Sequence, residues 1–163
     1  MSMRNVSPHP EKVPYPIIRP RPGQPVRCVC LTKTIFGVDT HFGNGQTYYC
    51  PGPEDCEACK GGGVARYQGY VMGLGFQSNV TAIVHLTANA AEMLEKLERP
   101  GRGLLGLKMS LFRTGKTDNG EVEAQAFGWE DHVAEFSRNR LSELMHSVYR
   151  VKGLQAKERK QSS

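Results

Sequence analysis

Four residues with metal-binding side chains lie in a segment rich in glycine and proline, and they limit what this chain can fold into. The segment reads His41-x8-Cys50-x5-Cys56-x2-Cys59 and continues as Lys-Gly-Gly-Gly. Zn²⁺ takes four tetrahedral ligands, and thiolates with an imidazole suit it. Because the segment has few apolar side chains for a core, a bound ion would supply most of its order. We therefore predict a structural Zn²⁺ site whose four ligands leave no position for water.

The two remaining cysteines, Cys28 and Cys30, are alternative ligands, above all in place of His41. They lie two residues apart, on one side of a predicted strand. Cysteine is among the residues most often buried in protein cores. This position therefore favours two core thiols over two metal ligands.

The composition is typical of one soluble domain in a reducing compartment. The chain has 163 residues, a hydrophobic content of 39% and no apolar run long enough to span a membrane. The first residues lack the apolar region of a secretory signal. We therefore expect a cytoplasmic protein that does not enter a membrane. There, thiols stay reduced, so the five cysteines are expected to be ligands or core residues rather than disulfides.

Charge and proline divide the chain into three parts. Residues 1–23 contain six prolines and carry a charge of +3, which predicts a basic arm that is extended or disordered. Residues 150–163 carry +4 and are expected to be a basic, disordered tail. The domain between them, 24–149, has a zinc-binding insertion at 41–59. Its segment 117–149 carries −5 and is a candidate surface for a protein partner.

Hydrophobic periodicity predicts a mainly β fold. The expected strands are 26–35, 65–76, 80–86, 105–111 and 122–126, with a loop from 36 to 63. Thr87 is the predicted N-cap of a helix over 88–97, and a final helix is expected over 131–149. This order predicts a five-stranded OB-fold-like barrel. Its zinc-binding loop lies between strands one and two, its internal helix between strands three and four, and its last helix at the C-terminal end. A five-stranded open sheet with a packed helix is the alternative.

Together, the ligand order and the strand order resemble those of the zinc-containing single-stranded DNA-binding proteins of T-even phages. In that family, an OB-fold carries a zinc subdomain whose ligands run His, Cys, Cys-x-x-Cys. The matching residues here are His41, Cys50, Cys56 and Cys59. The family ends in an acidic tail that recruits partners, whereas this chain ends in a basic one. The resemblance thus implies DNA binding and a zinc cofactor, without tail-mediated recruitment.

Aromatic and basic residues mark a candidate nucleic-acid surface. OB-folds bind single strands across their second and third strands and the flanking loops, by stacking bases on aromatic rings in a positive groove. The candidates are Tyr48, Tyr49, Arg66, Tyr67, Arg102, Lys108, Phe112, Arg113 and Lys116. Two of these residues have an alternative, purely structural role. Tyr49 could cover the zinc site, and Phe112 could lie under the final helix.

The predicted function is non-enzymatic binding of single-stranded DNA, in replication, recombination or a mobile element. An RNA-binding module and a zinc-stabilised adaptor for protein partners, bound through the last helix or segment 117–149, are the alternatives. The chain contains no G-x-x-x-x-G-K-[ST] loop, H-E-x-x-H motif or nucleophile elbow, so catalysis is not expected.

Overall fold

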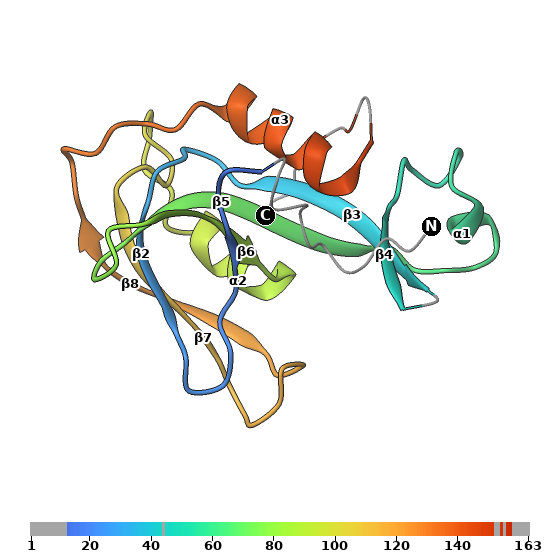
Figure 1. The fold of residues 1–163 in the computed structure, drawn as a ribbon, viewed down its shortest axis with the longest axis horizontal. Helices are drawn as coiled ribbons and strands as arrows, with labels where there is room; N and C mark the ends of the chain where they lie inside the picture. The colour runs from blue at the N-terminus through green and yellow to red at the C-terminus, as the bar shows by residue number, and fades with distance from the viewer. Residues whose placement is uncertain (1–12, 44, 152–153, 155, 158–163) are drawn as a thin grey trace.

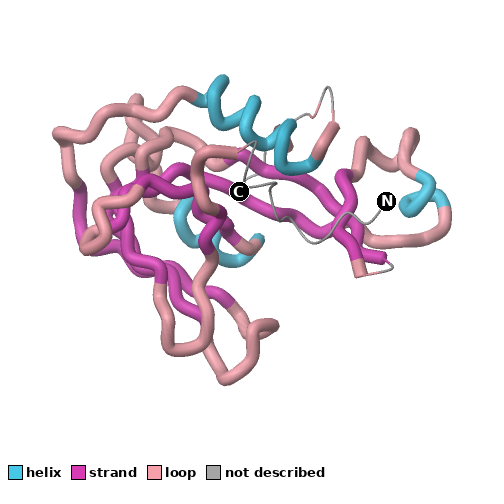
Figure 2. The backbone as a smooth tube through the Cα atoms, in the orientation of Figure 1, coloured by secondary structure: helices cyan, strands magenta, loops and turns pink. Residues whose placement is uncertain are grey.

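The computed structural model describes residues 13–43, 45–151, 154 and 156–157, and these form a mainly β protein (Figures 1 and 2). The strands are β1 (Ile17–Ile18), β2 (Val26–Cys30), β3 (Phe36–Gly43), β4 (Gln46–Tyr49), β5 (Arg66–Gly75), β6 (Thr81–Leu86), β7 (Leu107–Arg113) and β8 (Val122–Trp129). The helices are α1 (Glu57–Lys60), α2 (Ala88–Glu95) and α3 (Arg138–Tyr149). None of these helices is long and apolar enough to cross a membrane.

The eight strands form one mixed sheet built around the long strand β5. Along the main path the order is β1-β6-β5-β2-β7-β8, and β3 joins β5 to β4. β5 has ten residues, so one of its edges pairs with β3 along the first half and with β2 along the second. The other edge pairs with β6. All pairs are antiparallel except that of β1 with β6.

The sheet is open, which corrects the predicted five-stranded closed barrel. A closed barrel needs every strand paired on both edges. In the described part of the chain, the second edge of β6 pairs with the short parallel strand β1, and β8 pairs with β7 alone. Because the N-terminal segment takes that edge of β6, β6 does not pair with the last strand.

The predicted loop over 36–63 begins with a β-hairpin, and the predicted strand over 26–35 ends at Cys30. Alternating Phe36 and Val38 pack into the core from β3, and Gly43 pairs with Gln46 where β4 begins. The sequence carried two signals for this hairpin. Residues 36–42 alternate with period two, and an Asn-Gly pair, which favours tight hairpin turns, follows at 44–45.

The two longer helices begin at side-chain caps. The Thr87 side chain accepts a hydrogen bond from the Ala90 amide, so α2 begins where the sequence predicts and ends two residues earlier. It lies between the sixth and seventh strands rather than the third and fourth. α3 begins at the Ser137 cap rather than at residue 131, because Phe136 lies in an extended segment that bonds to the Leu31 carbonyl.

Two hydrophobic clusters hold the sheet, one on each face. The first places α3 over β3, β5 and β6, with Tyr70, Met72, Ile83, Leu141 and Met145 among its buried residues. Figure 1 shows α3 lying along β3 and β5. The second encloses the opposite face against α2, through Cys28, Val71, Val84, Leu94 and Met109.

The described parts of the predicted arms pack against this core. Val13 is buried in the first cluster and Ile17 pairs with Ile83, so this segment is held by contacts with the body of the sheet before it turns at 22–23. Near the other end, Leu154 is buried and the Lys157 ammonium pairs with the Asp39 carboxylate. The remaining residues of both arms, 1–12, 152–153, 155 and 158–163, lie outside the described residues.

Candidate metal centre

The structure brings the four predicted ligands together at the far end of the β3–β4 hairpin. Their ligand atoms all lie within 4.8 Å of one another. The His41 Nε2 atom is 3.2 Å from the Cys59 Sγ atom, and the Cys50 and Cys59 sulfurs are 3.5 Å apart. Three of the four residues are buried and Cys59 is partly buried. One imidazole and three thiols around a common point form a complete donor set for a tetrahedral cation.

Pairing between β3 and β4 positions the first two ligands. His41 lies opposite Tyr48 on the hairpin, so these two residues point to one face. Cys50 follows β4 and, by alternation, points to that face too. The Cys50 amide donates to the Asp39 carbonyl at 2.8 Å, which continues the hairpin by one more bond. The sheet register therefore directs both ligands to one side.

A single helical turn positions the other two ligands. Cys56 is the N-cap of α1 and Cys59 lies within it. The turn closes through bonds from the Lys60 amide to the Cys56 carbonyl and from the Gly63 amide to the Ala58 carbonyl. A Cβ atom at Gly63 would be 2.8 Å from that carbonyl oxygen, so only glycine fits there. This explains Gly63, and the positive φ of +88° explains Gly62, among the three glycines that follow the Cys-x-x-Cys motif.

The thiols influence one another's ionisation. The backbone N–H of Cys59 lowers the pKa of the Cys56 thiol. Desolvation, followed by the neighbouring sulfurs of Cys50 and Cys56, raises the pKa of the Cys59 thiol to about 12. Three thiolates this close repel one another, so the protein alone does not stabilise all three. A divalent cation would supply the missing charge and favour full ionisation.

Burial in this region is confined to the ligands. Among the described residues from 41 to 64, the buried residues are His41, Cys50 and Cys56, each one a ligand. Cys28 and Cys30, the alternative ligands, lie instead in the second hydrophobic cluster. Burial raises the pKa of Cys28 to about 12 and that of Cys30 to about 11, as expected for core thiols. The donor set of the hairpin end therefore fits a metal ion, and that of β2 does not.

Four of the predicted nucleic-acid contacts lie beside this cluster, on two different faces. Tyr49 packs at the edge of the first hydrophobic cluster, and Arg66 is exposed on the same face of β5. Tyr67 packs against the second cluster, and Tyr48 points to the metal face. Both rings are partly buried. Tyr49 and Arg66 therefore share one face of the sheet, and Tyr48 and Tyr67 share the other.

Four other predicted contacts lie on or after β7, which pairs with β2 and β8 rather than with the hairpin strands. Lys108 and Phe112 are half-buried, and Lys116 is exposed. Arg113 is held by the protein itself, since its Nε and Nη1 atoms donate to the carbonyls of Pro20 and Gly120 at 3.1 and 2.6 Å. The nine predicted residues therefore do not form one continuous set along paired strands.

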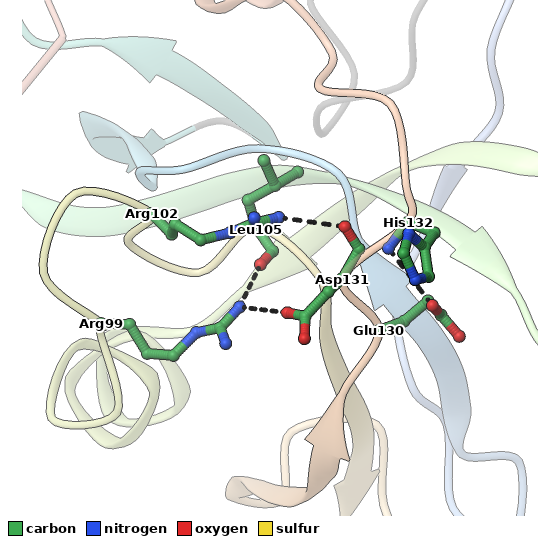
Figure 3. A network of polar contacts seen from close by, with 6 residues as sticks. All are labelled: Arg99, Arg102, Leu105, Glu130, Asp131 and His132. Atoms are coloured by element: carbon green, nitrogen blue, oxygen red, sulfur yellow. Dashed lines mark hydrogen bonds and ion pairs between the residues drawn. The ribbon is translucent and has the colours of Figure 1, made fainter.

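Arg102 lies in a polar network at the end of β8 (Figure 3). Its guanidinium donates to the Asp131 carbonyl at 3.4 Å, while Arg99 donates to the Asp131 carboxylate at 3.1 Å. Arg99 also lies over the Trp129 ring, 3.7 Å from its centroid. These contacts attach the segment before α3 to the loop that precedes β7. In this structure, Arg102, a predicted nucleic-acid contact, thus bonds to the segment that leads into α3.

The structure also reveals exposed side chains that the sequence analysis did not select, namely Arg27, Phe42, Phe76 and Phe127. Phe42 belongs to the period-two alternation of β3, and Arg27 alternates with Val26 and Cys28 on β2, so strand periodicity could have found both.

Protein-family models, curated proteins and solved structures yield no match to this chain, so no family is assigned by comparison.

Proposed function

We propose that this chain is a non-enzymatic protein that binds single-stranded DNA and carries one structural Zn²⁺ at His41, Cys50, Cys56 and Cys59. Zinc is the metal that best matches one imidazole and three thiolates. Four protein ligands fill a tetrahedral shell, leaving no position for a substrate or an activated water. The ion would hold the β3–β4 hairpin to the turn of α1.

The arrangement of Tyr49 and Arg66 around Thr40 is the observation that carries this proposal. Thr40 pairs with Tyr49 on one side and with Arg66 on the other, so the three residues form a row across β4, β3 and β5. The Thr40 hydroxyl bonds to the Arg66 carbonyl at 3.1 Å, which helps to fix the row. Phe42 points to the same face two residues along β3 and is 62% exposed.

This row combines the groups that single-strand binding needs. Aromatic rings stack on unpaired bases, and an exposed guanidinium binds phosphate and also stacks. A duplex hides the faces of its bases, so it would compete poorly for such a surface. The last helix, α3, packs its apolar side into the first cluster and carries no basic row suited to a major groove.

Titration of the full-length, metal-loaded protein against labelled single strands and duplexes of equal length, at two salt concentrations, tests the proposal. We expect tighter binding to the single strand. Arg66→Ala should weaken that binding and make its salt dependence shallower, because fewer counterions are released. Lys96→Ala removes an exposed charge after α2 and is the matched control.

Equal affinity for duplex and single strand would contradict the proposal. Tighter binding to an RNA strand of the same sequence would favour the RNA-binding alternative instead. If the protein binds neither nucleic acid, the adaptor function becomes the better explanation of the exposed Phe42.

A further inference from the structure

A second exposed surface lies on the outer side of β2, β7 and β8, away from the metal centre. Cys28, Met109, Leu111, Val122 and Ala124 pack against the second hydrophobic cluster from these strands. Because side chains alternate along a strand, their neighbours point to the other side. We call that side the β7 face. Its exposed or partly exposed residues are Arg27, Lys108, Phe112, Glu123, Gln125 and Phe127, with Phe76 at its edge, and they surround the buried Ser110.

Strand register shows that most of these residues adjoin one another, and a β-bulge opposite Lys108 and Met109 leaves Phe127 without a partner on β7. Ser110 pairs with Arg27 of β2 and with Gln125 of β8, so the three form a row across the strands. The Phe76 amide donates to the Arg27 carbonyl at 3.2 Å, which extends the row beyond the end of β5. Phe112 lies two residues from Ser110 on β7, in the next row.

No described helix covers this face. The buried residues of the first hydrophobic cluster, which lies under α3, come from neither β7 nor β8. In Figure 1, α3 runs along β3 and β5 above the sheet, whereas β7 and β8 lie at the opposite end of the view. As a result, Phe127 is 54% exposed and Phe76 is 43% exposed. Exposed aromatic rings that gather on one face, here beside the half-buried Phe112, are candidates for an interaction site.

The two cations of this face lack side-chain partners among the residues that the structure describes. Neither Arg27 nor Lys108 forms a side-chain hydrogen bond or ion pair with another described residue, whereas Arg99 and Arg113 do. Glu123 is the one acidic side chain on the face, so positive charge exceeds negative charge there. The bond from Arg113 to the Pro20 carbonyl also places the segment that carries exposed Arg19 and Arg21 near the end of β7.

We infer that the β7 face is the main base-stacking surface for a single-stranded nucleic acid, with Phe76, Phe112 and Phe127 as stacking rings and Arg27 and Lys108 as phosphate contacts. This inference rests on the proposed function and assigns most of the base-stacking energy to a second surface, apart from the row that contains Arg66. A sheet face with exposed aromatic rings can stack successive bases without reading their sequence. Cations without a partner in the described part of the chain, lying beside aromatic rings, suit a phosphodiester backbone better than they suit an apolar partner.

Binding of a labelled oligothymidine to the metal-loaded, full-length protein tests the inference. Replacing one stacking ring by alanine typically weakens binding on the order of 5- to 100-fold. We expect a loss of that size for Phe127→Ala, and a weaker affinity with a shallower salt dependence for Arg27→Ala. Leu97→Ala removes an exposed apolar side chain just after α2 and is the matched control, with wild-type affinity expected. Circular dichroism and metal content verify that each variant is folded.

Photocrosslinking with a bromouracil oligonucleotide gives an independent readout, and we expect crosslinks in peptides spanning 107–129. If the wild type binds but Phe127→Ala and Arg27→Ala keep its affinity, while Arg66→Ala weakens binding and crosslinks fall in 39–67, the inference is wrong and the proposed function stands. If the wild type binds no nucleic acid, the proposed function fails and the inference fails with it. Loss of a homo-oligomer in Phe127→Ala, without nucleic-acid binding by the wild type, would identify the face as a protein interface.

Discussion

The body of the sheet and its metal-binding end are stabilised by different interactions. In the body, two clusters of buried apolar side chains cover both faces of the sheet under α2 and α3. From residue 41 to 64, the buried described residues are candidate metal ligands, while Phe42 and Val64 remain exposed. The hydrophobic effect therefore orders the body, whereas the order of the hairpin end depends on the proposed metal ion. This difference predicts that either region can be disrupted with limited damage to the other.

Removing one ligand should have the largest effect. We expect about one Zn²⁺ per wild-type chain and almost none in Cys56→Ser, because a three-ligand shell binds the ion far more weakly. Hydrogen exchange should accelerate across 41–64 and stay slow in β5 and α2. Elemental analysis and exchange mass spectrometry measure both effects.

Cys28→Ser is the matched control, because Cys28 is a buried cysteine of the body. It should retain the metal but lower the free energy of unfolding by about 1–3 kcal/mol, since a hydroxyl enters an apolar cluster. Metal loss in Cys28→Ser with retention in Cys56→Ser would mean that the ligands are assigned to the wrong cysteines.

Phe36 and His41 lie on the same strand, β3, but belong to different regions. Phe36 is buried in the first cluster, so Phe36→Ala should lower the free energy of unfolding by about 3–5 kcal/mol while the protein keeps its metal. Phe42→Ala, on the same strand but exposed, should change it by less than about 0.5 kcal/mol. Urea unfolding combined with metal analysis measures both. Release of metal from folded Phe36→Ala would show that the two regions are coupled.

His85 gives the body a pH dependence of its own. Burial, followed by the charges of Arg19 and Arg113, lowers the pKa of His85 to about 4 from 6.5. In the unfolded chain His85 takes up a proton below about pH 6.5, while in the folded protein it stays neutral until about pH 4. The contribution of neutral His85 to the free energy of unfolding is therefore fully present above pH 6.5. It falls as the pH is lowered towards 4, by at most about 3 kcal/mol.

The variant His85→Gln, which keeps a neutral polar group beside Gln68, should lose this part of the pH dependence. Unfolding curves for both proteins at pH 7, 6 and 5 provide the comparison, with metal content measured at each pH to separate ligand protonation. Identical slopes in the two proteins would show that His85 does not contribute.

Local sequence patterns predicted those features that depend on residues close together in the chain. The Cys-x-x-Cys spacing, the Thr87 cap and the alternation of β5, β6 and β7 each involve groups within a few residues, and the structure contains all three. The hairpin of β3 and β4 differs from the predicted loop although its signal is local, because the glycines and cysteines of 43–63 favour a loop over the same segment. His41 was therefore identified as a ligand without the strand that positions it.

Long-range pairing decided the rest. Whether the sheet closes depends on which segment takes the second edge of β6, and β1 takes it through Ile17 and Ile83, residues far apart in sequence. The positions of the candidate contacts depend equally on pairing, since β7 adjoins β2 and thus separates Lys108 from Arg66. The sequence by itself determined the candidate ligand set and the mainly β character, because both follow from short-range spacing. Only the tertiary structure decided the open sheet, the face covered by α3 and the face left exposed, because those follow from competition among distant strands for the same edges.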